Sequence, residues 1–99
     1  MAVLVRVPTP LRKFTGGKAE LQAEGSSVRE VFANVEAMHG GITEKVFDTG
    51  GGIRRFINVF VNGEDIRYLQ GPETSVKAGD ELSIVPAIAG GGGSRGQDR

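Results

Sequence analysis

Four consecutive glycines, residues 90–93, are the part of this sequence with the clearest use in chemistry. They follow an apolar segment that we expect to be a strand, so a backbone without side chains would project from a folded domain. Such a backbone can thread a narrow channel that any Cβ atom would block, and the unhindered carboxylate of a terminal glycine can be adenylated. The letters Gly-Gly-Gly-Gly-Ser at 90–94 also describe a plain flexible linker, and that alternative stays open.

The usual catalytic side chains are absent or isolated. The sequence has no cysteine, which excludes disulfides, thiolate metal sites and thiol redox chemistry. The single histidine, His39, falls in the last turn of an expected helix, where free carbonyl groups favour a cationic ring. It has no evident base, nucleophile or metal partner. We therefore expect a protein that is not an enzyme and that binds no cofactor or metal itself.

A second candidate site is a protein-binding patch on the segment 53–61. The residues of one apolar face of this expected strand are Ile57, Val59 and Val61. Strand alternation then places Phe56 and Phe60 on the other face. Because a single helix covers only one face of a sheet, these aromatics predict an exposed interface with a rim formed by Arg54 and Arg67. Partial cover by a loop or by the arginine side chains is the alternative.

Five strands are expected to position these residues, each identified by alternating or β-branched apolar residues. They span residues 2–7, 18–24, 53–61, 65–68 and 81–86. The prolines at 8 and 10 end the first strand, because proline cannot donate to a sheet ladder. Asn62-Gly63 predicts a hairpin, since both central positions of a type I′ turn need positive φ.

One main helix is expected after the second strand. Ser27 and Glu30 have the spacing of a capping box that begins a helix. Its apolar stripe consists of Val28, Val31, Phe32, Val35 and Met38. Two glycines at 40–41 are expected to cap its C-terminus. Residues 42–48 are expected to add a short helical turn whose inward side chains are Val46 and Phe47.

This order of elements favours an α+β fold. The first and last strands are short and apolar, so we expect them to be neighbours in the middle of a mixed sheet. One helix across one face of that sheet gives the β-grasp (ubiquitin-like) arrangement. Residues 1–89 would form this domain, and residues 90–99 a flexible glycine-rich tail with no apolar residue after Ala89.

Length and charge limit the remaining possibilities. A chain of 99 residues is one small domain. Twelve Lys and Arg balance twelve Asp and Glu, and no basic run exceeds two residues, so we expect no nucleic acid or membrane partner. No segment approaches the roughly 20 apolar residues of a membrane span. We expect a cytoplasmic monomer whose partners are proteins or small molecules.

Three segments carry a resemblance to a known family. They read Val-Arg-Val-Pro-Thr-Pro-Leu-Arg (5–12), Arg-Phe-Ile-Asn-Val-Phe-Val-Asn-Gly-Glu-Asp-Ile-Arg (55–67) and Gly-Asp-Glu-Leu-Ser-Ile-Val-Pro-Ala-Ile-Ala-Gly-Gly (79–91). Over residues 1–91 the sequence resembles the ubiquitin-like sulfur carriers of the ThiS/MoaD family, most of all the CysO-type carriers of cysteine synthesis.

The resemblance implies a terminal diglycine, Gly90 and Gly91, that bears the cargo. An ATP-dependent adenylating enzyme and a sulfurtransferase would convert Gly91 to a thiocarboxylate. Its sulfur would pass to a pyridoxal-phosphate-dependent cysteine synthase, and a zinc metalloprotease would release the cysteine. ATP, pyridoxal phosphate and zinc would thus be bound by partners. The exposed strand face docks the activating enzyme in this family, which adds Val85 to Phe56 and Phe60.

The sequence departs from this family pattern at its end. Eight residues, Gly92 to Arg99, follow Gly91. We expect a protease to trim them, with cleavage after Gly93 as an alternative and an extension added by cloning as another. Two other functions stay open: a ubiquitin-like modifier joined to lysines through Gly91, and an interaction module with an inert tail.

Overall fold

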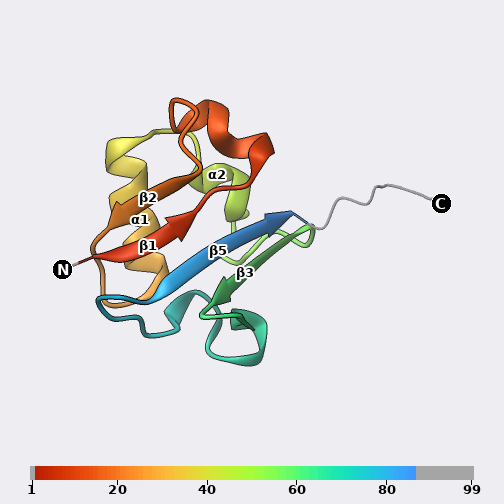
Figure 1. Cartoon of the computed structure of the whole chain (residues 1–99). Helices are drawn as coiled ribbons and strands as arrows, with labels where there is room; N and C mark the ends of the chain where they lie inside the picture. The colour runs from red at the N-terminus through yellow and green to blue at the C-terminus, as the bar shows by residue number, and fades with distance from the viewer. Residues whose placement is uncertain (1, 87–99) are drawn as a thin grey trace.

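The computed structural model describes residues 2–86, which form a mixed sheet packed against helices (Figure 1). Its strands are β1 (Val3–Arg6), β2 (Glu20–Ala23), β3 (Ile57–Val61), β4 (Glu64–Asp65) and β5 (Glu81–Pro86). The α-helices are α1 (Val28–Met38) and α2 (Thr43–Val46). Short 3-10 helices are η1 (Thr9–Phe14), η2 (Ile66–Tyr68) and η3 (Gly71–Glu73). The expected domain boundary at residue 89, the tail at 90–99, and Gly90 and Gly91 lie outside the described residues.

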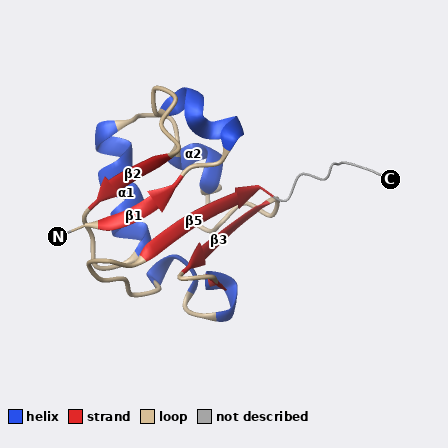
Figure 2. Cartoon of the chain, in the orientation of Figure 1, coloured by secondary structure: helices blue, strands red, loops and turns tan. Residues whose placement is uncertain are grey.

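The sheet has the strand order β2-β1-β5-β3-β4. β1 and β5 run parallel at its centre, and β2 and β3 flank them antiparallel. α1 lies across one face, as Figure 2 shows. The α+β class, the mixed sheet and the β-grasp arrangement are therefore confirmed. Because β1 and β5 are parallel, both end at the same side of the sheet.

The core lies between the sheet and α1. Val3, Val5, Leu82 and their neighbours on the strands meet the buried stripe of α1. That stripe comprises Val28, Val31, Phe32 and Val35. Phe47, just after α2, packs edge-on against Phe32 with ring centroids 5.2 Å apart, so α2 closes one end of the core.

The two ends of α1 differ in detail from the predicted caps. The Ser27 hydroxyl accepts the amide of Glu30 at 3.2 Å, but the Glu30 carboxylate reaches back to the Ser26 amide, at 2.6 Å, instead of that of Ser27. At the other end Met38 is 52% exposed, so its predicted place in the buried stripe is wrong. The helix ends there because the chain turns at His39, the C-cap residue, whose amide still bonds to the Val35 carbonyl.

The hairpin after β3 is confirmed, but the returning strand is shorter than predicted. Asn62 and Gly63 have φ of 52° and 88°, as a type I′ turn requires. β4 ends at Asp65, whose carboxylate accepts the Arg67 amide at 2.9 Å and starts η2. This local cap turns the fully buried Ile66 into the core, so the predicted strand at 65–68 is wrong.

The strands β2 and β3 also begin later than predicted. A turn at 54–57 precedes β3, held by the Arg54 amide on the Val46 carbonyl (2.8 Å) and the Ile57 amide on the Arg54 carbonyl (2.9 Å). Strand alternation therefore does not extend back from Ile57 to Arg54.

Candidate functional site

Alternate side chains of the central strands face away from α1 and form the open face of the sheet. On β3 and β5 these include Phe60 and Val85. Phe60 pairs across the sheet with Ser83, and Val85 with Asn58, so Phe60 and Val85 are diagonal neighbours within side-chain reach. Phe60 is half-buried and Val85 is 41% exposed. The structure thus brings these two predicted interface residues together.

Arg67 also reaches this region, but it is engaged within the fold. Its guanidinium donates to the carbonyls of Ile57 at 2.6 Å and Arg54 at 3.1 Å, and to the side-chain oxygen of Asn58. These bonds satisfy carbonyl groups at the start of β3, where β4 does not pair. Arg67 therefore fixes the turn before β3 and borders the open face through Asn58.

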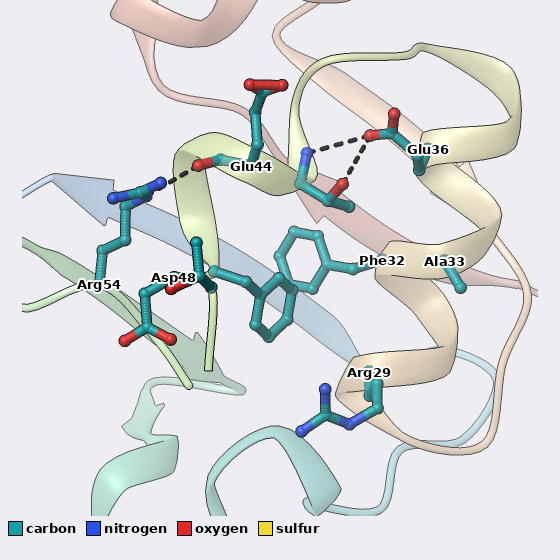
Figure 3. Close-up of a pocket in the computed structure, with 10 residues that line it drawn as sticks. Arg29, Phe32, Ala33, Glu36, Glu44, Asp48 and Arg54 are labelled. Atoms are coloured by element: carbon teal, nitrogen blue, oxygen red, sulfur yellow. Dashed lines mark hydrogen bonds between the residues drawn. The ribbon is translucent and has the colours of Figure 1, made fainter. Parts of the chain in front are cut away.

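Phe56 and Arg54 diverge at that turn. Phe56 is 62% exposed, and the Arg55 guanidinium lies 5.6 Å from the centre of its ring. Arg54 points toward the helices, where its Nε donates to the Glu44 carbonyl at 2.7 Å (Figure 3). The prediction that Arg54 shares the open face with Phe60 is wrong, because the turn ends the alternation.

The open face includes residues that sequence reasoning missed. The Arg6 guanidinium on β1 pairs with Glu20 on β2, at 3.0 Å, and with Glu81 on β5. The half-buried Leu4 lies two residues earlier on the same side of β1. Both residues alternate with Val3 and Val5 along β1, and this pattern could have placed them on the open face from the sequence alone. The cross-strand ion pairs could not be predicted from the sequence, because they join residues far apart in the chain.

The chain leaves the described fold at Pro86, beside two grooves. Pro86 pairs with Ile57, the first residue of β3. On the β1 side a groove of about 310 Å³ is lined by residues that include Arg12 and Val85. On the other side a groove of about 490 Å³ includes Arg55 and Phe56. Val85 and Phe56 thus lie on opposite sides of Pro86, the last described residue.

A larger hollow, of about 560 Å³, lies on the helix side between α1 and α2 (Figure 3). Four of its five charged side chains have hydrogen-bond partners in the fold: Arg29, Glu36, Asp48 and Arg54. The Glu36 carboxylate accepts from the hydroxyl of Thr43 at 2.6 Å, and Asp48 accepts the amides of Gly50 and Gly52. Arg29 donates to Glu73. This hollow therefore offers a ligand few unpaired polar groups.

Within residues 2–86, three carboxyl groups have a lowered pKa, and in each case hydrogen bonds within the fold are the main cause. The pKa of Glu30 is lowered by the amide and hydroxyl of Ser26. The pKa of Glu36 is lowered by the Thr43 hydroxyl and then by backbone amides. The pKa of Asp80 is lowered by the Asn62 side chain and the Lys77 amide. All three stabilise turns or helix ends, and none is placed as a proton donor at neutral pH.

No group of three or more metal-ligating side chains occurs within residues 2–86. In the same part of the chain, no helix has the length and apolar character needed to cross a membrane.

Comparisons with known proteins agree with this geometry. The ThiS family model matches residues 5–91. The chain is 41% identical to the sulfur carrier protein CysO of Mycobacterium tuberculosis over 93 residues, which covers 92% of this chain and all of the relative. Its structure matches CysO in the BexX/CysO complex of Amycolatopsis orientalis with a TM-score of 0.87 and 47% identity, over 91% of this chain and all of the other. The small archaeal modifier protein 1 of Methanosarcina acetivorans matches with a TM-score of 0.77 and 30% identity, over 91% and 96% of the two chains.

Proposed function

From the premise that this chain belongs to the ThiS family and that its similarity to CysO makes it a sulfur carrier of cysteine biosynthesis, we propose that Gly91 bears the sulfur as a thiocarboxylate. The observation that carries this proposal is the extent of the family match, which runs to residue 91 and leaves Gly92 to Arg99 beyond it. A protease would first remove those eight residues to expose the Gly91 carboxylate.

The proposed chemistry takes place on Gly91 but is performed by partners. A carboxylate oxygen of Gly91 attacks the α-phosphorus of ATP, which forms an acyl adenylate and releases pyrophosphate. A sulfide sulfur then attacks the acyl carbon, and AMP leaves, so that one oxygen of the carboxylate has been replaced by sulfur. Glycine suits this site because no Cβ hinders either attack. The carrier supplies no acid, base or metal to these steps.

The distance from Pro86 to Gly91 limits where the activating enzyme can bind. Residues 87–91 can span at most about 17 Å when fully extended. The adenylation site of a partner must therefore lie within that distance of Pro86, and its surface must contact the surrounding residues. Phe56 and Val85 are the exposed apolar side chains on either side of this point, and Phe60 borders Val85. We assign these residues to the docking surface.

The wider set of partners belongs to the same proposal. An adenylating enzyme, a sulfurtransferase, a pyridoxal-phosphate-dependent cysteine synthase and a zinc metalloprotease would act in turn on the Gly91 terminus, and the chain itself would bind no cofactor and be no enzyme. The complex of BexX with a CysO that is 47% identical to this chain supports a carrier that works by docking to other proteins. We place the protein in the cytoplasm as a monomer.

Growth without cysteine tests this function in cells that lack the gene. We expect the wild-type chain to restore growth and Gly91→Ala to fail, because a Cβ at the acyl residue blocks entry to the adenylation site. Gly93→Ala is the matched control, since residue 93 is removed before activation. Restored growth with Gly91→Ala would contradict the proposal. If Gly93→Ala failed to restore growth while Gly91→Ala restored it, the reactive terminus would be Gly93 instead.

A further inference from the structure

The charged side chains of this neutral chain are segregated along the sheet. We call the side where β1 and β5 end and β3 begins the Pro86 end, and the opposite side the Asp80 end. Within residues 2–86, six cations besides Arg67 have no carboxylate within 4.0 Å. Unlike Arg67, none of the six donates hydrogen bonds to several oxygens at once. They are Arg12, Lys13, Lys18, Lys45, Arg54 and Arg55.

Backbone contacts place all six at the Pro86 end. Arg12 follows β1 and its Nε donates to the Val7 carbonyl at 3.1 Å. The Val7 amide bonds to the Ala19 carbonyl, which brings Lys18 beside it. The ammonium groups of Lys13 and Lys45 lie 5.4 and 5.9 Å from the centre of the Phe14 ring, so η1 and α2 carry neighbouring charges. The Arg54 amide bonds to the Val46 carbonyl, which adds Arg54 and Arg55 to the same group.

The Asp80 end has the opposite charge. Its acidic residues are Glu24, Glu30, Glu64, Asp65, Glu73, Asp80 and Glu81. The cations that meet these acids are all ion-paired: Arg29 with Glu73 at 2.6 Å, Lys77 with Asp80 at 3.6 Å, and Arg6 of β1 with Glu81. Within residues 2–86, the sheet is therefore positively charged at one end and negatively charged at the other, although the net charge of the chain is zero.

The acids near the Pro86 end compensate only part of its charge. Glu20 is already paired with Arg6. Asp48 accepts two backbone amides, and Glu44 and Glu36 are the other carboxylates of this region. The six unpaired cations and Arg67 outnumber them, so the grooves on both sides of Pro86 are bordered by positive charge.

We propose that the Pro86 end docks a carboxylate-rich rim around the adenylation site of the activating enzyme. This inference rests on the proposed function, since Gly91 reaches only about 17 Å from Pro86 and the partner must cover this end to receive it. A basic or neutral rim would leave the cations desolvated without partners, whereas an acidic rim attracts them over a distance of about 10 Å. The opposite charge of the Asp80 end also orients the carrier, so that Gly91 approaches first.

The rate of thiocarboxylate formation tests the inference. The purified full-length chain is added with ATP and sulfide to an extract of cells that lack its gene, and intact mass follows the product. The test variant is Lys45→Glu/Arg55→Glu, because neither side chain makes a hydrogen bond in the described structure. Lys45→Arg/Arg55→Lys keeps the charge, and Lys77→Glu changes a cation at the Asp80 end. Thermal unfolding of each variant is measured first, and its melting temperature should match that of the wild type.

We expect the Lys45→Glu/Arg55→Glu variant to react about tenfold more slowly than wild type at roughly 50 mM KCl, with a smaller difference at roughly 300 mM. Both controls should stay within about twofold of wild type. If the double variant does not fold, Lys13→Glu/Lys18→Glu takes its place with the same expectation. Wild-type rates for the charge-reversed variant would overturn the inference and leave the proposed function intact. No conversion of the wild-type chain would instead contradict the proposed function, and the inference with it.

Discussion

At the scale of single residues, hydrogen-bonded carboxylates hold the turns that shape the sheet. Asp80 is the clearest case, with 7% of its surface exposed. It accepts the Asn62 side-chain amide at 3.1 Å and the Lys77 amide at 2.9 Å. It therefore ties the hairpin after β3 to the turn before β5, and these bonds favour its charged form.

Asp80→Asn should lower the free energy of unfolding at pH 7 by about 2 kcal/mol, because an amide cannot accept both bonds as a carboxylate does. The lowered pKa of Asp80 means that its contribution is complete above its ordinary value of about 3.9 and is lost as the pH falls through the folded-state pKa. Urea unfolding from pH 7 to pH 2 should therefore show wild type converging on the variant below about pH 4. Parallel curves would contradict this role; Glu30 and Glu36 remain in both proteins and cancel from the comparison.

Phe56 is the residue whose exposure best separates docking from stability. Because it is 62% exposed, Phe56→Ala should change the unfolding free energy by no more than about 0.5 kcal/mol. Removal of this aromatic from the proposed interface should cost about 1–2 kcal/mol of transition-state binding. The loss would be measured as a lower kcat/KM for thiocarboxylate formation. Met38→Ala is the matched control, since Met38 is 52% exposed on α1, away from the open face. An equal effect of both variants would contradict the assignment of Phe56 to the docking surface.

At the scale of elements, the entry to α1 depends on a close backbone approach. A Cβ on Gly25 would lie 2.7 Å from the Val31 amide nitrogen and 2.8 Å from a Val31 methyl carbon. Val31 is fully buried, so it cannot move aside. Gly25 therefore lets the chain pass against the first turn of the helix.

Gly25→Ala should destabilise the protein by about 2 kcal/mol through overpacking, measured by urea unfolding. Gly40→Ala provides the comparison, because its added Cβ would meet only the Glu36 carboxylate at 3.5 Å. We expect that variant to unfold within about 0.5 kcal/mol of wild type. Similar losses for the two variants would show that the contact with Val31 is not the cause.

The elements that the sequence predicts well are those with regular periodicity. β1, β5, the buried part of α1 and the Asn62-Gly63 hairpin follow alternation, helical spacing or positive φ. The η1 helix after Pro8 was not predicted. β4 was predicted too long because the Asp65 carboxylate caps η2 and ends the strand there. Arg54 was misplaced because its amide bonds to the Val46 carbonyl of α2, a contact that strand alternation does not reveal.

Some residues of the candidate site could be predicted from the sequence, and others required the structure. Composition alone identifies the glycine run, and strand parity identifies Phe60. The role of Arg67 required the structure, since its guanidinium bonds to carbonyls 10 and 13 residues earlier in the chain. The position of Val85 beside Asn58 likewise follows from the pairing of β3 with β5.

At the scale of the whole molecule, the fold places Pro86, the last described residue, at the positively charged end of the sheet. The parallel β1 and β5 finish on the same side as the start of β3, and this gathers the unpaired cations, Phe56 and Val85 around Pro86. The proposed carrier function needs this arrangement, because the proposed cargo site, Gly91, is five residues beyond Pro86. The described residues hold no group of three or more metal-ligating side chains, and the lowered pKa values of their carboxyl groups have structural causes.

The intact mass of the protein isolated from its own cells under sulfur-limited growth tests the central claim most directly. We predict a species that ends at Gly91 and is heavier than the free carboxylate by the exchange of one oxygen for sulfur. Reaction with a thiol-specific alkylating reagent should shift that species alone, because the chain has no cysteine. If only the full-length chain ending at Arg99 is found, or if Gly91 is joined to lysines of other proteins without any thiocarboxylate, the sulfur-carrier account is contradicted.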